Sequence, residues 1–188
     1  MRAGTGLALE VTVSATEIFL ERSRYYIAEE YPEKIRQCVA ALPDGELWKR
    51  ANESSNSIGN LLLHLAGNIR QWIVGGVGGA PVQRDRPAEF SARDGPAAAT
   101  LLENLESAVR DADPVIARLS PQDLLRSITI QGRETTVLAA IYHVVEHFAM
   151  HTGQIVLLTK QRAPEVIRFY DDSVGNATPL WGGREGMR

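Results

Sequence analysis

The chain has one cysteine, Cys38, among its 188 residues. A single thiol excludes an intrachain disulfide framework and a cysteine-based zinc knuckle, and we expect Cys38 to be a small buried residue on a helix. The chain also lacks an apolar run near the ~20 residues that a membrane helix needs, and Glu10 interrupts its apolar start before a signal-peptide core forms. We therefore expect a cytoplasmic protein with no membrane partner.

An excess of charge of one sign is missing as well. Twenty Lys and Arg residues oppose 23 Asp and Glu residues, which gives a formal net charge of −3. A nonspecific nucleic-acid binder needs a basic excess, so nucleic acid is disfavoured as the main partner. The length corresponds to one domain. We expect this single domain to span residues 1–188, with a flexible arm at 1–12 and a tail at 178–188.

Four long segments repeat apolar residues with the helical period near 3.6, and short links join most of them. We expect a kink or restart at Pro32 and a helix end at Gly75-Gly76, because proline disrupts a helix interior and glycine often ends a helix. The alternating residues 127–130 predict a short extended piece. The four helical segments cover about residues 14–42, 55–74, 96–119 and 134–161. This pattern predicts an all-α four-helix bundle.

The four histidines are the most informative residues. His143, His147 and His151 are spaced i, i+4, i+8 on the fourth predicted helix, and His64 lies midway along the second. Neighbours at i, i+4 lie ~5–6 Å apart at Cβ, so two imidazoles at that spacing can bind one metal ion. The whole stripe covers ~12 Å, too far for one ion to bind all three. The pair is therefore His143–His147 or His147–His151, with His64 as the available third ligand.

The second predicted helix carries a polar stripe beside His64. Asn60, His64 and Asn68 recur every four residues, in step with Asn52 and Asn56 before them. Such a stripe on a leucine-rich helix either faces solvent or lines a polar cavity. If His64 binds a metal, Asn60 and Asn68 become the pocket walls on either side of it. The long loop at residues 75–95, rich in glycine, proline and charge, would complete the pocket, since loops of this length are often functional.

Two other motifs compete with this interpretation. The segment His143-Val144-Val145-Glu146-His147 matches the H-x-x-E-H pattern of inverted zinc peptidases, in which Glu146 would be the general base. That reading leaves His64 and His151 without a role. The glycine-rich stretch at residues 75–79 lacks the Lys-Ser/Thr ending and the preceding strand of a phosphate-binding loop. Neither motif accounts for the histidines as well as a three-histidine site does.

Two longer motifs resemble the DinB-like superfamily. The first is Asn56-Ser57-Ile58-Gly59-Asn60-Leu61-Leu62-Leu63-His64-Leu65-Ala66-Gly67-Asn68, followed by Arg70-Gln71-Trp72; the second is His143-Val144-Val145-Glu146-His147-Phe148-Ala149-Met150-His151-Thr152-Gly153-Gln154-Ile155. The segment Arg86-Pro87-Ala88-Glu89-Phe90 also fits an uncharacterised bacterial branch. The resemblance covers roughly residues 15–170.

The resemblance implies an up-down-down-up four-helix bundle, usually a homodimer, that holds a zinc or nickel ion. The family's ligands carry over to His64, His147 and His151, which leaves His143 outside the ligand set. Thr152 stands where the family often has arginine. Characterised relatives are bacillithiol and mycothiol S-transferases and a mycothiol-dependent isomerase, in which the metal lowers the pKa of a low-molecular-weight thiol.

The resemblance and the histidines together predict a metal-dependent enzyme with a small-molecule substrate. The reaction is either thiol S-transfer to an electrophile or hydrolysis by metal-bound water. A non-catalytic metal-binding or sensor dimer is the alternative.

Overall fold

The computed structural model describes residues 13–43, 45–163, 167–173, 175 and 177–181. The predicted arm at 1–12 therefore lies outside the described residues, as do residues 182–188 of the predicted tail. Long helices dominate the described part of the chain. They are α1 (Ala15–Tyr25), α2 (Tyr31–Ala40), α3 (Ile58–Ile69), α5 (Ala98–Ala117) and α7 (Val137–Arg162), with π-helical segments η1 (Tyr26–Glu30) and η2 (Arg70–Val77).

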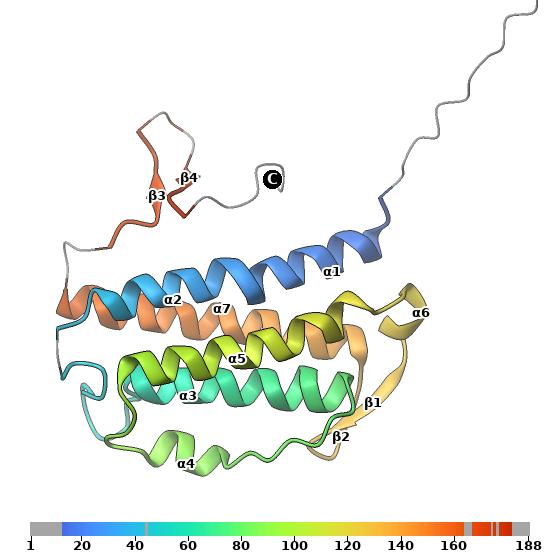
Figure 1. The fold of residues 1–188 in the computed structure, drawn as a ribbon, viewed down its shortest axis with the longest axis horizontal. Helices are drawn as coiled ribbons and strands as arrows, with labels where there is room; N and C mark the ends of the chain where they lie inside the picture. Colours follow the sequence, from blue (N-terminus) through green and yellow to red (C-terminus); the bar gives the residue numbers. More distant parts are fainter. Residues whose placement is uncertain (1–12, 44, 164–166, 174, 176, 182–188) are drawn as a thin grey trace, which may run out of the picture.

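These helices form a four-helix bundle, as the sequence predicted. The segments α1, η1 and α2 join into one rod, and η2 extends α3. In Figure 1 the α1–α2 rod and α7 run in one direction, whereas α3 and α5 run in the opposite direction. Helix α3 packs beside α5, and α2 packs beside α7. The order is thus up-down-down-up, and the parallel neighbours α3 and α5 require the long connection that carries α4 (Arg86–Ser91).

A π-helical segment lies at or next to each of the two predicted helix breaks: η1 directly precedes the helix that contains Pro32, and η2 contains Gly75 and Gly76. At Pro32 the helical rod restarts, as predicted: α2 begins at Tyr31, directly after the π-helical segment η1. The amide of Tyr31 donates to the carbonyl of Tyr26, and Pro32 follows in the first turn of α2, where a missing N–H is tolerated. The second helix, by contrast, does not end at Gly75-Gly76 as predicted but continues through both glycines and ends after Val77. A Cβ at Gly76 would overlap the side chain of Ile130, so this glycine permits close packing rather than ending the helix.

A β-hairpin, not a helix, precedes α7. Strand β1 (Ser127–Ile130) confirms the predicted extended piece and pairs antiparallel with β2 (Arg133–Thr136). Glu134 therefore lies in a strand, and the fourth helix begins three residues later than predicted, with Thr136 as its N-cap. The two turn residues Gln131 and Gly132 have φ of 53° and 74°, the left-handed conformation that a tight hairpin turn requires.

The core lies between the four long helices. Cys38 is fully buried on α2, as predicted, and Phe148 of α7 is among the largest buried side chains. The remaining short elements are α6 (Pro121–Leu124), β3 (Tyr170–Asp171) and β4 (Thr178–Pro179). Because β4 pairs with β3, the start of the segment expected to be a loose tail belongs to a strand pair. No helix in the described part of the chain is both long and apolar enough to cross a membrane.

Candidate metal centre

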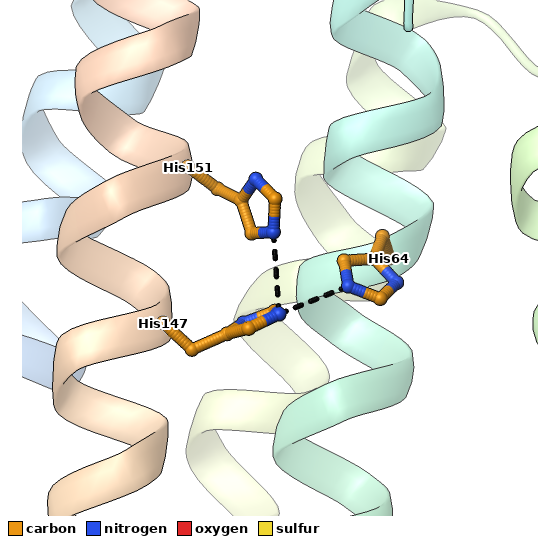
Figure 2. Close-up of side chains that lie close together, drawn as sticks. All are labelled: His64, His147 and His151. Carbon is orange, nitrogen blue, oxygen red and sulfur yellow. Dashed lines mark hydrogen bonds between the residues drawn. The ribbon is translucent and has the colours of Figure 1, made fainter.

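Three histidines from two helices converge at the middle of the bundle. His64 projects from α3, and His147 and His151 project from consecutive turns of α7 (Figure 2). The Nε2 atom of His147 lies 3.0 Å from that of His64 and 3.2 Å from that of His151. One ligand nitrogen from each residue lies within 4.8 Å of the others. The structure thus brings together the three residues that the family resemblance singled out.

The outer ring nitrogens of two histidines are bonded to oxygen atoms. His64 Nδ1 lies 2.8 Å from Glu89 Oε2, and His151 Nδ1 lies 2.8 Å from Gln154 Oε1. A carboxylate or an amide oxygen can only accept, so each Nδ1 carries the proton and donates. The Nε2 atoms of both rings then present lone pairs toward the centre of the cluster. Such hydrogen bonds are how proteins fix the orientation of metal-binding histidines.

Glu89 comes from α4, the short helix in the long connection. Its carboxylate also accepts from Arg84, at 2.6 Å from Nε and 2.8 Å from Nη2. Burial alone would raise the pKa of this carboxyl, but the hydrogen bonds from Arg84 and His64 outweigh burial and lower the pKa below its ordinary value. Glu89 is therefore ionised at neutral pH. Arg84 Nη2 also lies 3.0 Å from His64 Nδ1, but both are donors and share the carboxylate as acceptor.

His147 stands at the centre of the cluster in its neutral form. Burial, together with the neighbouring His151 and His64, lowers the pKa of His147 to about 3. Burial also lowers the pKa of His151. His147 Nδ1 is buried with no hydrogen-bond partner among the described residues. A single proton on His147 Nε2 can satisfy only one of the two lone pairs that face it. A metal cation where the three rings meet would accept one Nε2 lone pair from each of the three histidines, so this donor set fits a divalent metal such as zinc.

His143 lies outside the cluster. Its ring packs against Trp72 with centroids 4.2 Å apart, and its centroid is 5.4 Å from that of His147. Burial lowers the pKa of His143. Glu146, the general base of the competing H-x-x-E-H motif, is exposed on the surface of α7. The helix therefore does not present the two histidines and the glutamate of that motif to one site.

A cavity of about 580 Å³ adjoins the cluster. Asn68 and Trp72 line one wall, and His143 and His147 line another. The asparagine stripe is buried rather than facing solvent, since Asn60 and Asn68 are 0% and 4% exposed. The remaining lining residues are His64, Arg84, Arg86, Gln131 and Arg133.

Asn60, expected to form the pocket wall on the other side of His64 from Asn68, does not line this cavity and makes a different set of contacts. Its Oδ1 accepts from the Ser57 amide at 3.0 Å, which caps α3, and its Nδ2 donates to the Glu89 carbonyl at 2.7 Å. Arg50 Nη2 donates to the same Oδ1 at 2.8 Å and to the carbonyl of Ala92 at 2.7 Å. Asn60 therefore ties the backbone of α4 to the start of α3, one turn before His64.

Sequence reasoning identified the long connection but missed Glu89 and Arg84. Glu89 is 25 residues from His64, so no spacing rule links them. The available signal was the charged run Arg84-Asp85-Arg86-Pro87-Ala88-Glu89, in which Asp85 and Pro87 also mark a helix start.

The fold and the site together define an up-down-down-up four-helix bundle with three histidines converging between two helices. Two solved structures share this fold. A DinB-like protein from Bacillus cereus ATCC 10987 is 18% identical with a TM-score of 0.61, and the match covers 81% of this chain and 95% of that chain. YfiT from Bacillus subtilis, described as a probable metal-dependent hydrolase with an unusual four-helix bundle topology, is 17% identical with a TM-score of 0.64, over 82% and 92% of the two chains.

The chain belongs to the family described as "Protein of unknown function (DUF1572)", whose model matches residues 14–168. Comparison with curated proteins gives no match. The two solved structures confirm, at the level of the fold, the resemblance to DinB-like proteins that the two histidine motifs predicted.

Proposed function

We propose that this protein is a metal-dependent enzyme that holds a divalent ion, zinc or nickel, on His64, His147 and His151. One observation carries the proposal: three imidazoles meet beside a cavity large enough for a small molecule. Three histidine ligands leave positions open for a substrate, as in catalytic zinc sites. The description of YfiT as a probable metal-dependent hydrolase supports the same reading.

Residues around the three histidines have separate proposed roles in orienting the ligands and in accepting a proton. Glu89 and Gln154 hold the rings of His64 and His151 with their Nε2 lone pairs inward. When bound, the ion supplies a Lewis acid that lowers the pKa of a thiol or of water. His143 is neutral at pH 7 because burial lowers its pKa, and it lines the cavity next to His147, where it can accept a proton that the nucleophile releases.

The reaction is either S-transfer from a low-molecular-weight thiol to an electrophile or hydrolysis of a small substrate. Cys38 cannot serve as the thiol, because it is fully buried in the core. A transferase of this kind therefore takes its thiol from solution. A non-catalytic metal sensor is the alternative, but the open cavity beside the histidines favours an enzyme, since a purely structural or sensing site needs no room for a substrate.

We also propose a homodimer in the cytoplasm. Helix α7 exposes several large apolar side chains that a second copy could cover, namely Leu138, Tyr142, Met150 and Leu157. Exposed apolar patches of this sort are typical of protein interfaces. The free thiol of Cys38 is compatible with a reducing compartment.

Metal content tests the ligand assignment. The His151→Ala variant should be nearly metal-free after purification, because it loses a direct ligand. The matched control, His143→Ala, removes a neighbouring histidine from the same helix and should stay loaded when metal is in excess. Metal analysis by mass spectrometry measures both. An empty His143→Ala protein beside a loaded His151→Ala protein would shift the site by one helical turn and refute the assignment.

Activity tests the enzyme proposal separately. The metal-loaded wild-type protein is assayed with pairs of a thiol and an electrophile, and with ester and amide substrates. Turnover in either set, lost in His151→Ala, supports an enzyme and identifies the reaction class. A fully loaded protein without turnover in both sets would favour the sensor.

A further inference from the structure

The cavity beside the histidines has a strong charge imbalance. Arg84, Arg86 and Arg133 line it, and its lining contains no carboxylate. The positive charge of Arg84 is neutralised by its ion pair with Glu89. Arg86 and Arg133 are exposed to solvent, and neither makes an ion pair with any residue that the structure describes. Two uncompensated guanidinium groups therefore face a cavity that would also contain a metal cation.

Arg86 packs on an aromatic ring that also contacts the histidine cluster. Its guanidinium lies 5.0 Å from the centroid of Phe90, one turn later on α4, at the distance of a cation–π contact. The ring of Phe90 in turn packs on His64, with centroids 4.5 Å apart. Phe90 thus contacts both the exposed charge of Arg86 and the ring of a proposed metal ligand.

Arg133 is linked to the same site through the β-hairpin. It follows the turn residues Gln131 and Gly132, and Gln131 Nε2 donates to Gln71 Oε1 at 2.7 Å. The same Gln71 oxygen accepts from Arg84 Nη1 at 2.6 Å. The hairpin tip is therefore connected by hydrogen bonds to the Arg84–Glu89 pair that orients His64. This network keeps Arg133 at the rim of the cavity.

The inner part of the cavity offers recognition of another kind. Asn68 Oδ1 is buried without a hydrogen-bond partner among the described residues, which is costly unless a ligand supplies a donor. The rings of Trp72 and His143 form an aromatic wall beside it. A ligand with a flat apolar body would pack against this wall.

We infer that the substrate carries an oxyanion, a carboxylate or a phosphate, which Arg86 and Arg133 bind while its reacting end lies at the three histidines. Guanidinium groups bind both oxyanions with charge-assisted hydrogen bonds. This inference rests on the proposed function, because it names the substrate class of that site, but it concerns residues that do not bind the metal.

Calorimetric titration with three probes of similar shape tests the inference. Benzoate, phenyl phosphate and neutral benzamide are titrated into metal-free and metal-loaded protein at pH 8. In metal-free protein we expect at least one of the two anions to bind about tenfold more tightly than benzamide, and the tighter anion identifies the oxyanion. Arg86→Gln and Arg133→Gln should each remove most of that preference. Arg118→Gln is the matched control, because Arg118 is exposed, does not line this cavity, and changes the net charge equally.

The outcomes separate this inference from the proposed function. Equal binding of benzamide and both anions to wild-type protein, or an anion preference that survives both arginine substitutions, overturns the inference even if the metal analysis supports the histidine site. If the anion preference is also lost in Arg118→Gln, the preference is a nonspecific effect of net charge, and the inference is overturned. An anion preference in a protein that binds no metal would support the arginine pair and refute the metal site.

Discussion

The Glu89→Gln substitution probes the hydrogen-bonded pair behind His64 most directly. It preserves the shape of the side chain but replaces a carboxylate that accepts from Arg84 and from His64. The side chains of Arg84 and Glu89 are 6% and 10% exposed. Removing one partner of a buried ion pair typically costs ~3–5 kcal/mol, because the other charge stays buried without compensation.

This cost is large for a protein of this size. Domains are typically stable by about 5–15 kcal/mol, and with a urea m-value of about 2 kcal/mol/M the midpoint should fall by about 1.5–2.5 M. Urea unfolding is measured on metal-free protein, so that metal binding does not contribute to the stability. Metal affinity, measured by competition with a chromophoric chelator, should fall about 10–100-fold, because His64 Nδ1 loses its carboxylate acceptor.

Two further variants make the test decisive. The double variant Arg84→Met, Glu89→Gln removes both charges, so it should regain much of the lost stability while its metal affinity stays low. Glu146→Gln removes an exposed carboxylate from α7 and should change neither quantity. If Glu89→Gln unfolds within about 0.5 kcal/mol of wild type and binds metal equally well, the structural role assigned to Glu89 is wrong.

Three other perturbations test separate features of the structure. A Cβ at Gly67 would overlap Glu89 Oε1 and lie 2.8 Å from Arg84 Nε, so Gly67→Ala should destabilise the protein by about 1–3 kcal/mol in thermal unfolding and weaken metal binding, whereas Gly153→Ala, with open space around it, should not. Burial raises the pKa of Cys38 to about 11, so native protein should resist a thiol reagent at pH 8 and react fully once unfolded; rapid native labelling would contradict this burial. Tyr142→Arg places a charge on the exposed apolar face of α7 and should shift the sedimentation mass of the proposed dimer toward 20.6 kDa, while an unchanged dimer would exclude this face as the interface.

The sequence determined the helices because their signal is local. A period near 3.6 predicted the four long segments, and the bundle followed from their number and short links. The same logic placed Cys38 in the core and paired histidines at i, i+4 on one helix. Prediction from local sequence was wrong where contacts with distant parts of the chain decide the structure. Gly76 allows Ile130 to approach rather than ending the helix, and Glu134 pairs in a hairpin because residues 127–130 supply a partner strand.

The candidate site divides in the same way. Spacing alone left His143–His147 and His147–His151 as equal alternatives, because both pairs are one turn apart. The family resemblance favoured the second pair, and the structure brings that pair to His64 through the rotation of α7 against α3. Helix rotation depends on packing with the rest of the bundle, which no single helix encodes.

Tertiary structure alone placed the groups that orient and surround the histidines. Glu89 reaches His64 only because the connection between the parallel helices α3 and α5 folds back along α3, and Arg133 reaches the cavity only through the hairpin before α7. These contacts join residues far apart in the chain, so no periodicity could reveal them. The sequence fixes which side chains are available at each turn of a helix, whereas the packing of the helices decides which of them meet.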